Sequence, residues 1–299
     1  MGHNHQHGHD HSKDIPSSRL GWAFFLNFAF TIIEFIGGAL TNSTAILADA
    51  VHDLGDSLSL GLAWILNKLG SKPASQEFTY GYKRLNLAGA FINAAILIAG
   101  SAWVLVEAIP RLWDPQMPVA DGMIALAVLG ITVNGFAAYK LSRGKTLNER
   151  IINWHLLEDV LGWVAVLIVG IVLLFVDWPV LDPILSIGFT LFILVNVLRN
   201  LWSTLKLFIQ AVPDQKTYQE VAESLKRLPN VSDVHHLHFW SLDGESHVLT
   251  AHLVLSGNLE IDDLDALKKN IDKALAKYQL SHTTIELEHP DETCRDANA

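Results

Sequence analysis

Six long apolar stretches constrain this chain more than any other feature of its sequence. They cover residues 20–40, 44–66, 86–109, 119–141, 152–176 and 180–203. Each has about the 20 residues that a helix needs to cross the hydrocarbon core of a bilayer. The connections between them are short, and half of all residues are apolar. We therefore predict an α-helical membrane protein with six transmembrane helices that is embedded in a lipid bilayer.

Glycines recur inside these apolar stretches. They stand at Gly37, Gly38, Gly61, Gly89, Gly100, Gly130, Gly162 and Gly170. Glycine weakens a helix in water, but in a bilayer it allows two helix backbones to approach closely. Their distribution predicts tight contacts between the six helices.

The basic residues predict the orientation of the helices. If the N-terminus is cytoplasmic, the opposite side of the membrane holds only Arg111. The cytoplasmic segments and helix ends then hold Lys13, Arg19, Lys68, Lys72, Lys83, Arg84, Lys140, Arg143, Lys145, Arg150, Arg199 and Lys206. This asymmetry follows the positive-inside rule, so we expect both termini in the cytoplasm. The short loops and compact length favour the inner (plasma) membrane of a bacterium.

Beyond residue 206 the pattern becomes that of a water-soluble domain. It predicts a helix, two strands, a helix and a strand at 214–228, 231–242, 246–255, 261–278 and 283–288. The order αββαβ fits a small two-layer α+β domain. We therefore divide the chain into a tail at 1–18, a six-helix transmembrane domain at 19–205 and a cytoplasmic regulatory domain at 206–299.

The N-terminal tail and the overall charge restrict the partners. Five histidines stand in the first eleven residues, a composition that predicts a disordered segment that collects metal loosely. The net charge of −10 argues against nucleic acid as a partner. One cysteine, Cys294, excludes a disulfide framework or a multi-cysteine metal site within one chain.

Two apolar stretches carry the same pattern of ionisable residues. His52 and Asp56 stand in the second stretch, and His155 and Asp159 in the fifth, each pair with the spacing H-x-x-x-D. Residues four apart share one face of a helix, and ionisable side chains within a membrane are costly and usually functional. Two such helices facing each other would supply two nitrogens and two oxygens, a tetrahedral set that suits Zn²⁺.

The apolar stretches contain other polar residues as well. Asp49 lies one turn from His52 on the same face and could orient a ligand or line the exit pathway. We expect four others to be interhelical hydrogen-bond partners: Glu34, Asn27, Asn93 and Asn134.

Several functions are compatible with a buried metal site. The histidines and aspartates could form a polar network or a proton relay without metal. A membrane metalloenzyme would need an open coordination position and a general base, and a closed set of four ligands disfavours it. A metal sensor or a passive metal channel is not excluded by the pattern.

The motifs around these residues resemble those of the cation diffusion facilitator family, in particular its zinc-exporting branch. The similar segments span nearly the whole chain: AILADAVH at 45–52 with Asp56, FTYGYKR at 78–84, HLLEDVLG at 155–162, DPILS at 182–186, VHHLHFWSL at 234–242 and HTTIELE at 282–288. Glu158 and Trp163 depart from the family pattern, which often has small residues at these positions, and the role of Glu158 is open.

The resemblance implies a homodimeric secondary transporter rather than an enzyme. Such proteins exchange metal for protons by alternating access, and two-histidine, two-aspartate sites go with zinc, sometimes with cobalt or cadmium. We therefore expect an exporter of divalent metal, Zn²⁺ above others, with protons as the counter-ion. Metal selectivity and proton stoichiometry stay open.

The resemblance also implies a metallochaperone-like cytoplasmic domain that binds regulatory zinc. His235, His252, His282 and Glu288 are similar to metal-binding positions of relatives. Four others are expected to be bystanders, although Cys294 could close a site: Cys294, His236, His247 and His289.

Overall fold

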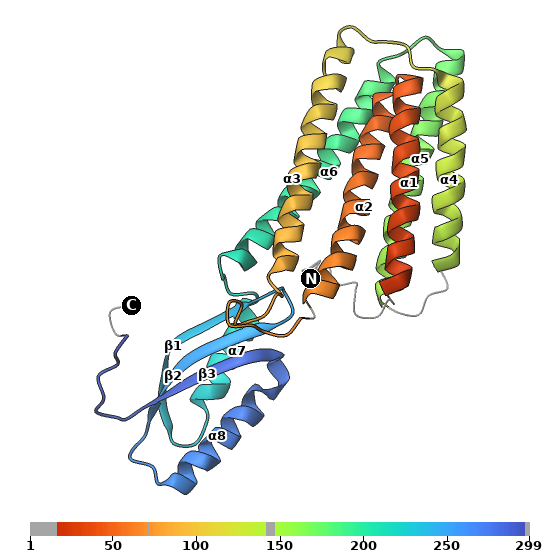
Figure 1. Cartoon of the computed structure of the whole chain (residues 1–299). Coiled ribbons are helices and arrows are strands. Elements are labelled where there is room, and N and C mark those ends of the chain that lie inside the picture. The colour runs from red at the N-terminus through yellow and green to blue at the C-terminus, as the bar shows by residue number, and fades with distance from the viewer. Residues whose placement is uncertain (1–16, 71, 142–146, 297–299) are drawn as a thin grey trace. The chain divides into compact units, whose positions relative to one another are not determined.

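The computed structural model describes residues 17–70, 72–141 and 147–296. Nearly all of the predicted tail, residues 1–16, lies outside this description. The described chain forms two compact units (Figure 1). One consists of residues 17–70, 72 and 88–201, and the other of residues 73–87 and 202–296.

The first unit is built from long helices. They are α1 Ser17–Thr41, α2 Thr44–Gly70, α3 Leu85–Ala108, α4 Ala120–Leu141, α5 Leu147–Phe175 and α6 Leu181–Phe208. Each corresponds to one predicted apolar stretch. The largest differences are at α5, which begins at Leu147 rather than 152, and at α6, which ends at Phe208 rather than 203. Apolar composition marks the part of a helix that suits lipid, whereas the helix itself continues into polar sequence.

Five of these helices are long and apolar enough to cross a membrane in the described part of the chain: α1, α3, α4, α5 and α6. Helix α2 has 27 residues, which is also long enough. It carries Asp49, Asp53 and Asp56, and these acids lower its hydropathy. The helix outside this group of five therefore contains half of the candidate metal ligands.

Two apolar clusters hold the helices together. The first joins α2, α4 and α5 through residues that include Ile46, Met123 and Trp163. The second joins α2, α3 and α6 through residues that include Val51 and Ile193. Helix α2 belongs to both clusters, so its position depends on contacts with most of the unit.

Polar side chains join neighbouring helices as well. Asn27 of α1 donates to the hydroxyl of Ser57 over 2.9 Å, and Asn93 of α3 donates to Ser59 over 2.9 Å. The prediction for these two residues is confirmed. The Nδ2 atom of Asn134 has no hydrogen-bond partner within the described residues, so the role expected for Asn134 stays a prediction. Glu34 of α1 lies beside Asp53 of α2, and a hydrogen bond between the two carboxyl groups requires a proton on one of them.

The second unit contains the predicted αββαβ order. Its elements are α7 Gln215–Lys226, β1 Val231–Ser241, β2 His247–Leu255, α8 Ile261–Leu275 and β3 Leu280–Glu288. The sheet order is β1-β2-β3, with β1 antiparallel and β3 parallel to β2. β3 begins three residues before the predicted 283, because Leu280 pairs with His247 on the neighbouring strand.

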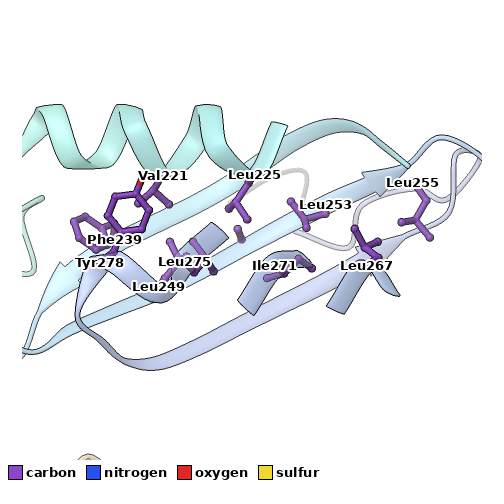
Figure 2. Packing of buried hydrophobic residues seen from close by; sticks show 11 residues of the cluster. Val221, Leu225, Phe239, Leu249, Leu253, Leu255, Leu267, Ile271, Leu275 and Tyr278 are labelled. Atoms are coloured by element: carbon purple, nitrogen blue, oxygen red, sulfur yellow. The ribbon is translucent and has the colours of Figure 1, made fainter. Parts of the chain in front are cut away.

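Both helices of this unit cover one face of the sheet. Alternate residues of β2, including Leu249 and Leu253, point toward Leu225 of α7 and Ile271 of α8 (Figure 2). The strand period of two then places His252 on the opposite face of the sheet. The core therefore fixes which histidines are available for a site.

Strand β1 contains an irregularity that the sequence pattern did not predict. The pairing register with β2 shifts between His235 and His238, and His236 has a positive φ of 46°. Such a bulge adds a residue to one strand and redirects the side chains beside it. In this strand it leaves His235 directly opposite His252.

We expect Gly130→Ala to destabilise the helical unit. A Cβ at Gly130 of α4 would overlap the ring of the fully buried Trp163 of α5, so one helix must shift. Overpacking of this kind costs about 1–3 kcal/mol. Thermal unfolding of the purified protein in detergent measures the effect.

Gly188→Ala is the matched control, because a Cβ at Gly188 of α6 meets no atom within 4 Å. It should leave the unfolding temperature unchanged or raise it slightly, since alanine favours helix. Equal unfolding temperatures for the two variants would contradict the close α4–α5 packing.

Candidate metal centres

The four residues predicted for the first site come together between α2 and α5. One ligand atom from each of His52, Asp56, His155 and Asp159 lies within 4.8 Å of the others. The helical spacing of four aligns each pair on its own helix. Packing of α2 and α5 into one apolar cluster brings the two pairs together.

The distances within this group show how its members interact. The Nε2 atom of His155 lies 2.8 Å from Oδ2 of Asp56 and forms a hydrogen bond between the two helices. The Nε2 atom of His52 lies 3.7 Å from Oδ2 of Asp56 and 3.7 Å from Oδ1 of Asp159. The two imidazole rings are 5.6 Å apart and nearly perpendicular. All four side chains therefore point at a common centre.

The four side chains differ in their exposure to solvent. Asp159 is almost fully buried, with 9% of its side chain exposed, whereas the exposed fraction of His155 is 38%. A zinc tetrahedron with bonds of about 2.0–2.1 Å has ligand atoms roughly 3.3 Å apart. Small rotations of the side chains would bring the four atoms to that spacing. The arrangement can accept one divalent ion without recruiting another residue.

Further acids are buried around this centre. Asp49 and Asp53 of α2 and Glu34 of α1 are all nearly inaccessible to solvent. Asp49 faces Gly162 of α5, and its Oδ2 atom has no hydrogen-bond partner in the described part of the chain. None of the three contributes an atom to the group of four. They surround the candidate ligands with carboxyl groups.

Glu158 lies outside the group although it is adjacent to Asp159. Its side chain is exposed, whereas Asp159 is buried. Consecutive helical residues point about 100° apart, so one faces the centre and the other does not.

A second group of possible ligands lies in the C-terminal unit. Its members are His235 of β1, His252 of β2, Glu288 of β3 and Cys294, and their ligand atoms lie within 4.8 Å of one another. The Nδ1 atom of His252 is 2.7 Å from Oε1 of Glu288, and His235 Nε2 is 3.0 Å from Oε2. The thiol of Cys294 lies 3.4 Å from His252 Nδ1. Two nitrogens, one oxygen and one sulfur form another set that suits Zn²⁺.

The pKa values in this second group follow from these contacts. Burial alone would raise the pKa of Glu288, but hydrogen bonds from Cys294 and His252 and the charge of His235 together lower it below its usual value. Burial raises the pKa of the Cys294 thiol, and the carboxylates of Glu288 and Asp296 add to this effect. A bound cation would favour the thiolate and so would lower the pKa of this thiol.

The structure places His282 apart from the other three residues predicted for this site. Its exposed side chain contacts Tyr80, with ring centroids 4.8 Å apart, and it is not in the group of four. His282 and Glu288 are six residues apart on one strand, about 20 Å along its length. Within one chain they cannot share an ion.

Cys294 is the residue that sequence reasoning set aside as a bystander. It follows β3 in a segment without regular structure, so no periodicity places its side chain. The only sequence signal was its residue type, because thiolate is a preferred ligand of zinc.

Comparisons with known proteins match both units. A family model described as the cation efflux transmembrane domain matches residues 21–209, and one described as the cation efflux protein, cytoplasmic domain, matches residues 213–290. The zinc transporter ZitB of Pectobacterium atrosepticum is 35% identical over 292 residues, which cover 95% of this chain and 89% of the relative.

Two further relatives match over nearly their full length, and the name of one mentions several metals. The cadmium, cobalt and zinc/H(+)-K(+) antiporter of Bacillus subtilis is 31% identical over 285 residues, covering 94% of this chain and 92% of the relative. The zinc transporter ZitB of Escherichia coli is 34% identical over 296 residues, covering 97% and 93%.

We expect Cys294→Ser to weaken Zn²⁺ binding by the C-terminal unit at least about tenfold, because a hydroxyl replaces the sulfur ligand. His282→Ala should leave this affinity unchanged. Both variants are titrated with Zn²⁺ by calorimetry in a background that carries Asp159→Ala, which removes one ligand of the first site. A loss in His282→Ala with none in Cys294→Ser would restore the set predicted from sequence.

Proposed function

The chain belongs to the cation diffusion facilitator family, and from this premise we propose that it exports a divalent metal ion, Zn²⁺ above others, from the cytoplasm in exchange for protons. The observation that carries the proposal is the convergence of His52, Asp56, His155 and Asp159 between two helices of the membrane unit. Two nitrogens and two oxygens favour Zn²⁺ over the harder ions Mg²⁺ and Mn²⁺. Cobalt and cadmium, which appear in the name of one relative, are the other candidate substrates.

Proton exchange follows from the way the four groups interact. The hydrogen bond between His155 and Asp56 requires a proton on one of the two atoms, and a metal ion would bind those same atoms. Metal and proton therefore exclude each other at this pair. A difference in proton concentration across the membrane can therefore change which of the two is bound.

Alternating access turns this competition into transport. On the cytoplasmic side, neutral histidines and ionised aspartates bind the metal. A movement of the helices then opens the site to the other side, where protons displace the metal. Return of the protonated site completes the cycle, and the proton gradient drives export. Asp49, buried one turn from His52, is proposed to line the outward pathway.

The proposed topology includes α2 as the sixth span. Its acids lower the hydropathy of the helix, and one of them, Asp56, belongs to the proposed site. Both termini then lie in the cytoplasm, and the membrane is the bacterial inner membrane. The C-terminal unit matches a cytoplasmic domain of the family, and we propose that it contributes to a homodimer.

The second group of ligands supports a regulatory role for zinc. His235, His252, Glu288 and Cys294 come from three strands and the segment after them. An ion at this position would fix that segment against the sheet and report the cytoplasmic metal concentration. Its binding would shift the equilibrium between transport states only if the states differ in affinity for it.

The proposed function predicts Zn²⁺ uptake into proteoliposomes that depends on an imposed pH gradient. Asp159→Ala should abolish this uptake, because it removes a ligand that is nearly fully buried within the site. A Zn²⁺-sensitive fluorophore inside the vesicles measures the rate.

Glu158→Gln is the matched control, since this neighbouring carboxyl points away from the site and should be dispensable. Uptake that ignores the pH gradient would indicate a passive channel. Metal binding without uptake would indicate a sensor, and turnover of a lipid or peptide would indicate an enzyme.

The regulatory role predicts a change in the zinc dependence of transport. His252→Ala should shift the Zn²⁺ concentration for half-maximal uptake and leave the affinity of the membrane site unchanged. Uptake rates over a range of Zn²⁺ concentrations are compared between the variant and the wild type. Identical curves would show that the second group plays no part in transport.

A further inference from the structure

A buried carboxylate at the start of α6 binds the start of α2. Asp182 is 1% exposed. Its Oδ1 atom accepts a hydrogen bond from the hydroxyl of Ser43 at 2.5 Å and lies 3.3 Å from the backbone nitrogen of Ala45. Its Oδ2 atom accepts bonds from the backbone nitrogen and the hydroxyl of Thr44, at 2.7 and 2.8 Å. Four donors therefore converge on one side chain.

These bonds satisfy groups that α2 cannot satisfy alone. The first N–H groups of any helix lack partners within it, and an unpaired group in an apolar environment costs several kcal/mol. The side chain of Ser43 serves one of them, the nitrogen of Ile46, at 3.2 Å. Asp182 serves two more from a different helix, and its negative charge favours the positive end of the α2 dipole. The N-terminal cap of α2 is thus shared with α6.

A second contact lies one turn along α6. The hydroxyl of Ser186, which is fully buried, donates to the carbonyl oxygen of Thr44 over 2.9 Å. Two contacts from successive turns of α6 resist rotation of α2 as well as its displacement along the axis. Farther along, α2 meets α6 through apolar residues that include Val51 and Ile193, and such contacts are not directional.

We propose that Asp182, together with Ser186, is a positioning residue for transport, because it sets the height and rotation of α2 and so places His52 and Asp56. These ligands follow Thr44 by about 12 and 18 Å along the helix. This inference rests on the proposed transport site.

The geometry shows why a small error in α2 matters. Side-chain ends lie about 5–6 Å from a helix axis, so a rotation of about 20° moves them by roughly 2 Å. Zinc ligands tolerate deviations of only about 0.2 Å. Loss of the Asp182 contacts would therefore weaken metal binding at a distance. Asp182 itself is no candidate ligand, because both of its oxygens already accept hydrogen bonds.

The test measures Zn²⁺ affinity and uptake kinetics for Asp182→Ala in the full-length protein. We expect at least a tenfold rise in both the Kd of the membrane site and the KM for uptake. Zn²⁺ binding by the C-terminal unit should not change. Asp121→Ala is the matched control, because Asp121 is an acid in the first turn of α4 whose side chain is exposed. It should leave all of these values at their wild-type levels.

Milder variants keep the test decisive if Asp182→Ala does not fold. Asp182→Asn retains one acceptor oxygen and should give an intermediate Kd, and Thr44→Val removes only one hydroxyl donor. Because Thr44 acts through Asp182, the two substitutions should not be additive. The loss of Zn²⁺ binding free energy in the double variant Asp182→Asn/Thr44→Val should be smaller than the sum of the losses in the two single variants. Additive losses, or a wild-type Kd in Asp182→Asn, would overturn the proposal.

Asp159→Ala separates this inference from the proposed function. If Asp159→Ala lowers Zn²⁺ binding and Asp182→Asn does not, the transport site stands and the positioning role fails. If Asp159→Ala leaves binding at the wild-type level, the transport site itself is wrong, and the positioning role fails with it.

Discussion

The cost of burying ionisable groups in an apolar helical unit is the constraint on which this structure depends. Four such groups lie buried or half-buried between α2 and α5: His52, Asp56, His155 and Asp159. Their burial is tolerated because each histidine lies close to an aspartate. A cation at their centre would offset the desolvation of both carboxylates. In the proposed cycle, the same cost favours replacement of the cation by protons when it leaves. Both a bound cation and bound protons would therefore offset the cost of burying the two carboxylates.

Neighbouring helices position α2 and α5, which carry the four candidate ligands. Glycine at Gly130 allows α4 to pack on Trp163 of α5, and the Asp182 carboxylate anchors the start of α2. The first contact is apolar and depends on shape, whereas the second is directional and depends on charge. Together they connect the ligand-bearing helices to neighbours that carry no ligand. The geometry of the candidate metal site therefore depends on the whole unit rather than on two helices.

The C-terminal unit brings together a similar set of four candidate ligands, but strand pairing rather than helical spacing positions most of them. In the membrane unit, helical spacing aligns each pair of ligands. In the sheet, a bulge in β1 leaves His235 opposite His252, and Glu288 arrives from the parallel strand β3. Cys294 then approaches from an irregular segment. The two candidate sites differ in the softness of their ligands, since only the second contains sulfur, and this difference is consistent with the regulatory role proposed for the second.

The sequence by itself determined the six long helices, the αββαβ order and the pairing of His52 with Asp56 and of His155 with Asp159. These features follow from local periodicity, which the chain carries in its own residue order. Only the tertiary structure decided that Cys294 rather than His282 joins the second group, that Glu34 is buried beside Asp53, and that Asp182 caps α2. Each of these depends on a contact between segments far apart in the chain, and no local pattern encodes the distance between them.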